Sequence, residues 1–362
     1  MHTVLLVIEG IGWFLAFALA ILVVYVYTAS YRPRLIEKVR VIGPNEGRTL
    51  PKNRVVKIMT WNIQFFAGRG YVFFFDLPKG KQKRITVDEK DLRKSFKRCI
   101  EIIKAEDPDI IMMQEVDVRS ARSRHHDQER EIAQALKTFP YRVSAFYNKS
   151  YFTPHAMVLG SWNMEVAIFS KYKIESAFRY QLSKIPMTWI VQLFYLKRCV
   201  LEARVAMQGG GYLSVMTTHL DAYAQGNDIM QRQVNEVDAL LAERTAAKVP
   251  WVIGGDFNLL PNAEARKSLV PDQRELYAKK SEIETLMKKY QVVPTAAELK
   301  GEGRAKWFTH APDRPDLFEL DRTLDYLFYS DLLEAKSHKV RSRDVQDISD
   351  HMPLIAEFKV KG

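Results

Sequence analysis

Residues 251–261 constrain the fold more than any other segment, because an apolar run there ends abruptly in glycines and polar side chains. Tryptophan, valine and isoleucine open the run, as in a buried strand. Gly254 and Gly255 fill no core volume, but they let the backbone approach a ligand closely. Asp256 and Asn258 would point the same way if the extended geometry continued. We expect these two side chains to orient a water and hold a phosphoryl oxygen; the alternative is a strand end followed by a polar turn.

Other apolar runs in the chain also deliver an acid, an amide or an imidazole at one end. Such groups gathered from several strand ends would build a divalent-metal phosphoesterase site, in which water itself can be the nucleophile. No serine, cysteine or threonine nucleophile is then needed. The groups that stand at one end of these runs are Asn62, Glu115, His219, Asp325, Asp350 and His351.

This ordered set of motifs resembles the endonuclease/exonuclease/phosphatase superfamily, which includes deoxyribonuclease-like nucleases, inositol polyphosphate phosphatases and neutral sphingomyelinases. The resemblance covers about residues 54 to 360. It implies an α/β fold in which a two-layer β-sandwich is flanked by helices. Strands alternating with helices would by themselves permit other α/β folds. We predict one catalytic domain over residues 54–362.

The expected cofactor is Mg²⁺, with Mn²⁺ as the alternative. Mg²⁺ prefers oxygen ligands and keeps several waters, so Glu115 is the first predicted ligand and Asn62 the second. Asp350 precedes a histidine and is predicted to hold the metal or the network around it.

The resemblance also implies how the water is activated. The histidine of the Ser-Asp-His motif, His351, is the predicted general base, and Asp325 is predicted to orient it. Asp256 is expected to orient the nucleophile or to share the base role. Asn258 and His219 are expected to bind the substrate phosphate, and His219 could instead assist the leaving group.

The N-terminal segment is the other distinct unit. Residues 10–29 contain no charged side chain, a length that can cross the hydrocarbon core of a bilayer as a helix. A cleavable signal peptide is the alternative, but no basic region precedes the run, and the run is longer than a typical signal core. A buried core helix fits less well, because the segment is apolar on every face. We predict a transmembrane anchor over residues 1–29.

The flanks of this segment predict its orientation. Arg32, Arg34, Lys38 and Arg40 follow the apolar run, whereas its N-terminal side has only the α-amino group, His2 and Glu9. The positive-inside rule therefore places the catalytic domain in the cytoplasm, with the protein crossing the membrane once. Residues 30–53, which mix prolines, glycines and charges, are predicted to be a juxtamembrane linker whose basic residues could bind anionic headgroups.

Two aromatic stretches and one acid leave alternatives open. Residues 65–75 contain five phenylalanines and a tyrosine, and basic residues follow at 79–84; residues 186–196 are also strongly apolar. Each stretch fits either a core element or an apolar rim pressed into a membrane. Glu165 stands where many relatives have glycine, and it would be either a surface residue, the preferred interpretation, or a carboxylate that orients His219.

The substrate is predicted from charge and from what the motifs lack. The net charge of +11 suits a partner rich in phosphate, either nucleic acid or an anionic membrane. The segments around Asp256 and Asp325 depart from the pattern of the inositol phosphatases, which argues against that branch. A dead scaffold is disfavoured because every expected site residue is present. We predict a membrane-anchored phosphoesterase, similar to neutral sphingomyelinases, that hydrolyses a phospholipid or sphingolipid phosphate ester. The alternative is a nuclease tethered to the membrane.

Overall fold

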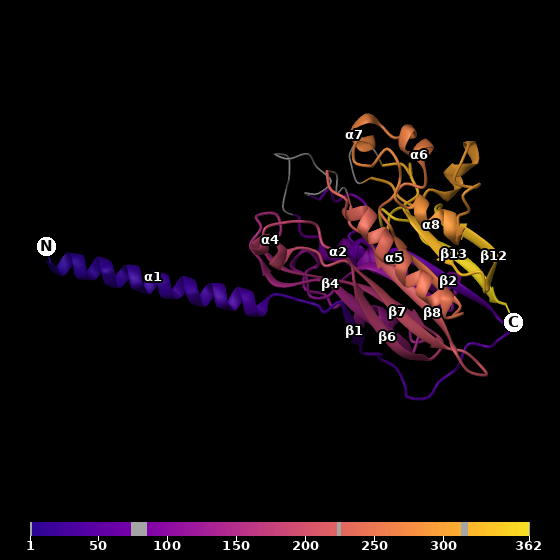
Figure 1. Cartoon of the computed structure of the whole chain (residues 1–362), viewed down its shortest axis with the longest axis horizontal. Coiled ribbons are helices and arrows are strands. Elements are labelled where there is room, and N and C mark those ends of the chain that lie inside the picture. Colours follow the sequence, from indigo (N-terminus) through magenta and orange to yellow (C-terminus); the bar gives the residue numbers. More distant parts are fainter. Residues whose placement is uncertain (1, 74–84, 223–225, 313–317, 362) are drawn as a thin grey trace.

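Two β-sheets stack face to face in the computed structural model of the chain, which describes residues 2–73, 85–222, 226–312 and 318–361 (Figure 1). One sheet has seven strands in the order β1-β6-β7-β8-β9-β11-β10, and the other has six in the order β12-β13-β2-β3-β5-β4. Helices cover the outer faces of both sheets. The predicted two-layer β-sandwich flanked by helices is therefore confirmed.

The strands and α-helices of the described residues have the following bounds. In the seven-stranded sheet the strands are β1 (Ile36–Val39), β6 (Ile174–Gln181), β7 (Cys199–Ala206), β8 (Tyr212–His219), β9 (Trp251–Asp256), β10 (Gln291–Val293) and β11 (Asp325–Tyr329). The six-stranded sheet comprises β2 (Val55–Asn62), β3 (Ile110–Asp117), β4 (Tyr141–Thr153), β5 (Gly160–Ser170), β12 (Leu333–Val340) and β13 (Leu354–Val360). The α-helices are α1 (His2–Ala29), α2 (Glu89–Glu106), α3 (Gln128–Ala135), α4 (Trp189–Phe194), α5 (Ile229–Ala246), α6 (Ala263–Ser268), α7 (Pro271–Arg274) and α8 (Glu284–Lys289).

Alternating side chains divide the core into layers. In β3, Ile110 and Met112 pack between the two sheets, whereas Ile111 and Met113 pack against the helical layer that includes α2. This alternation follows from the pleat of a strand, in which successive side chains point to opposite faces. On the other side of the sandwich, α5 packs its apolar face on the seven-stranded sheet.

Each sheet contains one parallel pair of strands near its centre. β2 pairs with β3 in the six-stranded sheet, and β8 pairs with β9 in the seven-stranded sheet; the other neighbouring pairs are antiparallel. β2 and β3 also pack on β8 and β9 across the sandwich. This arrangement brings the carboxyl ends of all four strands to one edge of the molecule.

The N-terminal segment forms a helix that projects away from the sandwich (Figure 1). Its stretch Val4–Thr28 is long and apolar enough to cross a membrane, and none of it is buried within the protein. Membrane spanning stays a prediction. Part of the predicted linker, residues 36–39, forms β1 and pairs with β6, so the sheet begins before residue 54.

The two aromatic stretches have different positions. Phe65, Phe66 and Phe73 are buried against α2, so the described part of residues 65–75 belongs to the core. Phe74 and Phe75, and the basic residues at 79–84, lie outside the described residues. Residues 186–196 instead contain the exposed helix α4, so the interpretation of that stretch as a core strand was wrong.

The preferred interpretation of Glu165 as a surface residue was wrong. Its side chain is buried, with a relative exposure of 5%, on β5, which is an inner strand of the six-stranded sheet. It does not orient His219 either, because among the described residues the Nδ1 atom of His219 has no hydrogen-bond partner. Burial, together with the nearby charge of Glu129, raises the pKa of Glu165 to about 8.

The raised pKa of Glu165 predicts a pH-dependent stability. Below pH 8 the folded protein keeps a proton that the unfolded chain, with an ordinary pKa of 4.5, releases, so stability falls as the pH rises between these values. We expect Glu165→Gln to stabilise the protein by roughly 3 kcal/mol at pH 7, since one pKa unit is worth about 1.4 kcal/mol. Thermal unfolding in detergent at pH 4.5 and pH 8 measures this gain, with exposed Glu175→Gln as the control. An equal shift at both pH values would contradict the prediction.

Candidate active site

The polar side chains at the carboxyl ends of the central strands meet in one cluster. Asn62 closes β2 and donates a hydrogen bond from Nδ2 to Glu115 Oε1, at 3.2 Å, on the neighbouring strand β3. The same Nδ2 atom donates to Asp256 Oδ2, at 3.1 Å, across the sandwich on β9. His219 closes β8, and its Nε2 atom lies 3.3 Å from the same carboxylate oxygen. Both sheets therefore contribute to the cluster.

The orientation of Asn62 differs from that of a metal ligand. Its Oδ1 atom accepts a hydrogen bond from the backbone N–H of Gln64 at 3.0 Å. A backbone N–H can only donate, so it fixes the amide oxygen on that side and turns the Nδ2 protons towards Glu115 and Asp256. An amide nitrogen does not bind a cation in this state. This orientation favours a role in positioning Glu115 over direct ligation by Asn62.

Glu115 reaches the cluster through a break in strand β3. The pairing of β3 with β5 shifts register between Met113 and Val116, and Glu115 itself has φ = 56°, in the left-handed region. A bulge of this kind turns a side chain away from the direction that regular alternation would give it. Among the described residues, Asn62 is the only hydrogen-bond partner found for the Glu115 carboxylate, and no cationic side chain forms an ion pair with it.

His351 sits between two carboxylates that come from the seven-stranded sheet. Its Nδ1 atom lies 2.8 Å from Asp325 Oδ2, and its Nε2 atom lies 3.4 Å from Asp256 Oδ2. The backbone around it is fixed from the other sheet, because the indole N–H of Trp61 donates to the His351 carbonyl at 2.9 Å. Ser349 also donates to the Asn62 carbonyl at 2.8 Å. The loop before β13 is thus tied to the end of β2.

The charged groups of this cluster change one another's pKa values. Burial opposes the charged form of His351, but the carboxylates of Asp325 and Asp256 outweigh burial and raise the pKa of His351 well above its ordinary value. Burial raises the pKa of Asp256 to about 6, although the charge of His351 opposes the increase. The resulting state is an imidazolium held between two carboxylates. Both of its ring nitrogens carry a proton, so the ring has no lone pair that could accept another one.

His219 has the opposite protonation state. Burial and the charges of Arg198 and His351 lower the pKa of His219 well below its ordinary value, so its ring is neutral. Because an ionised Asp256 oxygen can only accept, the proton of this neutral ring lies on Nε2. His219 can therefore donate a hydrogen bond but holds no spare proton at neutral pH.

Asn258 does not continue the extended geometry of β9, contrary to the expectation from the sequence. Its backbone has φ = 53°, and its N–H donates to Asp256 Oδ1 at 2.9 Å. Its side-chain amide donates to the Leu220 carbonyl at 3.0 Å. A left-handed asparagine is common in turns, because its short side chain tolerates this conformation. The turn still leaves Asn258 and Asp256 facing the same cavity.

A cavity of about 250 Å³ opens onto this cluster. Part of its wall is polar or charged and includes Asp350 and Asp221. The other lining residues include apolar or aromatic side chains, and two of these residues directly follow α4 in sequence. These apolar lining residues are Trp162, Met164, Tyr195 and Leu196.

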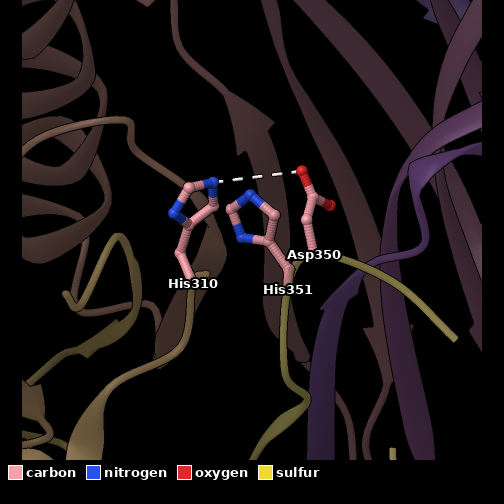
Figure 2. Close-up of side chains that lie close together, drawn as sticks. All are labelled: His310, Asp350 and His351. Carbon is pink, nitrogen blue, oxygen red and sulfur yellow. Dashed lines mark ion pairs between the residues drawn. The ribbon is translucent and has the colours of Figure 1, made fainter. Parts of the chain in front are cut away.

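His310 and Arg198 are among the cavity residues that were not predicted as site residues from the sequence. His310 packs edge to face on His351, with ring centroids 4.6 Å apart, and its Nε2 atom lies 3.9 Å from Asp350 Oδ2 (Figure 2). Its loop has no strand-like pattern that would have marked it. Arg198 is paired with Asp221 at 3.1 Å and lines the cavity, and no hydrogen-bond partner for its Nη1 atom is found in the part of the chain that the structure describes. In the sequence, Arg198 lies two residues beyond the apolar stretch 186–196.

The donor atoms in the cavity fit a divalent cation. Two sets of three side chains among the described residues bring ligand atoms within 4.8 Å of one another, and both contain His351: one adds His310 and Asp350, the other Asp256 and Asp325. Sets that contain imidazole suit transition metals better than Mg²⁺, which prefers oxygen. The carboxylates of Glu115 and Asp350 line the same cavity and supply such oxygens.

Comparison with known proteins identifies what the fold resembles. Residues 59–351 match the model of the Endonuclease/Exonuclease/phosphatase family. An endonuclease/exonuclease/phosphatase from Beutenbergia cavernae DSM 12333 shares 20% identity over 85% of this chain and 72% of its own, with a TM-score of 0.55. The human Nocturnin catalytic domain with bound sulfate shares 17% identity over 89% of this chain and 97% of its own, with a TM-score of 0.54. No curated protein sequence gives a significant match.

Proposed function

The chain belongs to the Endonuclease/Exonuclease/phosphatase family and is a metal-dependent phosphoric ester hydrolase, and we propose that its substrate is a phosphate ester of a membrane lipid. The observation that carries this proposal is the apolar part of the cavity wall. Tyr195 and Leu196 line the cavity together with the catalytic cluster and directly follow the exposed helix α4 in sequence. Such a wall suits the apolar body of a phospholipid or sphingolipid, whereas nucleic acid is usually bound by basic grooves and stacking aromatic platforms.

We also propose that the protein is anchored beside its substrate. Helix α1 would span the membrane once within residues 1–29. Residues 30–53, of which 36–39 form β1 of the seven-stranded sheet, would connect it to the rest of the catalytic domain predicted over 54–362. The length and apolar character of Val4–Thr28 support the span. Basic residues at 32, 34, 38 and 40 support a cytoplasmic catalytic domain.

We assign the metal to the oxygen side of the cavity. Glu115 and Asp350 would hold Mg²⁺ or Mn²⁺, and Asn62 would keep the Glu115 carboxylate in place through the 3.2 Å hydrogen bond. When bound, the cation polarises a phosphoryl oxygen and offsets the charge that develops on the leaving oxygen. The absence of an ion-pair partner for Glu115 among the described residues supports this assignment, because a paired carboxylate would have to break its pair first.

The attacking water would lose its proton to the Asp256–His351 pair. His351 alone is a poor base while it carries a proton, so Asp256 Oδ2 accepts the water proton as the water oxygen bonds to phosphorus. The ester oxygen leaves with the bonding electrons. The positive charge of His351 then stabilises the negative charge on the phosphoryl group, and Asp325 holds the ring in position. This shared role modifies the expectation that His351 acts alone as the base.

The phosphate would be held by neutral donors and one cation. Asn258 has a second amide proton available beside the one donated to Leu220. His219 would exchange its Nε2 contact with Asp256 for the phosphate, because its ring lines the same cavity. Among the described residues no hydrogen-bond partner is found for the Nη1 group of Arg198, which would add a cation from the cavity wall. Donors that already point at the reacting group cost little reorganisation during the reaction.

A paired assay of the full chain in detergent-lipid mixtures tests the proposed substrate. With Mg²⁺ present, we expect hydrolysis of mixed phospholipid and sphingolipid vesicles and no nicking of plasmid DNA. Glu115→Gln should abolish the vesicle activity, which excludes a contaminating hydrolase. Plasmid cleavage without lipid turnover would contradict the lipid substrate and favour a tethered nuclease, which the net charge of +11 would suit.

A further inference from the structure

We propose that one apolar surface of the catalytic domain seats in the bilayer interface beside the active-site cavity. This surface, the α4 face, combines helix α4 with the tip of the β4–β5 hairpin. Its consequence for catalysis rests on the proposed lipid substrate, whereas the contact itself does not. The residues of the α4 face are Tyr151, Phe152, Met187, Trp189, Ile190 and Val191.

The α4 face is apolar and uncovered. Trp189 has a relative exposure of 61% and Tyr151 of 64%, and no residue of α4 is buried. A soluble protein rarely gathers large apolar side chains on one surface unless that surface meets a partner or a membrane. Aromatic side chains in particular favour the headgroup level of a bilayer.

Both parts of the α4 face are connected to strand β4. α4 packs on β4, and the hairpin tip is the far end of the same strand, which runs to Thr153. Lys149 on β4 extends its ammonium group over the Tyr151 ring, 6.0 Å from the centroid. Exposed Lys184 precedes α4 in the chain. Basic side chains at the margin of an apolar surface suit a bilayer with anionic headgroups.

The anchor helix leaves the protein from this strand as well. The hydroxyl of Tyr31, two residues beyond the end of α1, donates a hydrogen bond to the Phe146 carbonyl on β4 at 3.2 Å. Figure 1 shows α4 at the end of the sandwich from which α1 projects. A bilayer that contains α1 therefore lies on the side of the α4 face. This continuity is why we infer a lipid surface, and not a protein, as the occupant.

A buried lysine fixes α4 beside the active site. Lys197 donates from Nζ to the carbonyls of Gln192, Leu193 and Tyr195, at 3.2, 3.3 and 2.8 Å, which holds the last turn of α4 and the residue after it. The next residue, Arg198, lines the cavity. A lipid phosphate at the interface would thus reach the cavity along Tyr195, next to α4.

Fluorescence from a single labelled site tests the contact directly. Ile190→Cys of the full chain is labelled with an environment-sensitive dye and placed in vesicles that carry a shallow lipid quencher. We expect a blue-shifted emission and strong quenching. The control is Asp331→Cys, which is exposed in the turn before β12, near the C-terminal end of β13. Equal, weak quenching at both sites would overturn the docking proposal, whatever the substrate.

Activity measurements separate this proposal from that of the lipid substrate. We expect Trp189→Asp to lower turnover of vesicle lipid by at least about tenfold, because a charge replaces an apolar side chain in the interface. Turnover of a monomeric short-chain lipid phosphodiester should be unchanged. Equal loss on both substrates would overturn the role of the α4 face in access to the cavity. If the unmutated protein did not hydrolyse lipid, the proposed substrate would be contradicted. The quenching result would still test whether the α4 face contacts the bilayer.

Discussion

Replacing Glu115 by glutamine should lower kcat by about 10³-fold or more, since cation charge stabilisation is worth several kcal/mol and each 1.4 kcal/mol changes the rate tenfold. Glutamine keeps the size of the side chain and can still meet the Asn62 amide through its carbonyl oxygen. It removes only the negative charge. The same variant should weaken Mn²⁺ binding, measured by electron paramagnetic resonance titration, by at least about tenfold.

The control for this variant is Glu357→Gln, at a half-exposed position of β13 outside the cavity. It should leave both kcat and the Mn²⁺ affinity unchanged. Retention of wild-type activity by Glu115→Gln, with an intact circular dichroism spectrum, would remove Glu115 from the metal site.

His351→Asn is expected to lower kcat by about 10²–10⁴-fold, the usual contribution of a positioned proton-transfer group. The asparagine Nδ2 group can replace the imidazole Nδ1 as donor to Asp325, which keeps the 2.8 Å contact. Nothing replaces Nε2 beside Asp256. The loss of proton transfer should therefore appear in single-turnover rates at saturating Mg²⁺, measured on protein shown by circular dichroism to be folded.

Exposed His125 offers the matched control, because His125→Asn changes the same atoms away from the cavity. A normal rate is expected for it. If His351→Asn also kept at least half of the wild-type rate, His351 would have no part in activating the water, and Asp256 would have to act without it.

The arrangement of strands could be predicted because its signals are local. The alternation of Ile110, Ile111, Met112 and Met113 fixes which faces of β3 are buried, and the apolar run before Asp256 marks β9 in the same way. Each apolar run also predicted the position of the polar group at its end. The structure brings Asn62, Glu115, His219, Asp256, Asn258, Asp325 and His351 into contact or into one cavity, although their roles stay predictions.

The finer geometry of the site depends on partners that no local pattern reveals. The direction of the Asn62 amide is set by the backbone N–H of Gln64, and the position of Glu115 by a bulge in the pairing with β5. His310 enters the site only through its packing on His351. These contacts arise when distant segments pack together.

The two aromatic stretches show the same limit. Both looked equally suited to a core or a membrane. Phe65 is buried because Arg122 covers its ring at 3.5 Å and Phe73 packs against it, whereas no element of the described chain covers Trp189. Composition alone does not distinguish a ring that finds a partner within the chain from one that does not.

The position of the bound cation tests the central claim most directly, and anomalous scattering from crystals of the detergent-solubilised full chain with Mn²⁺ measures it. We predict one strong peak at about 2.2 Å from the Glu115 carboxylate, facing Asp256 and His351 across the cavity. A peak ligated only by His310, Asp350 and His351, or one outside the cavity, would contradict the proposed hydrolytic site.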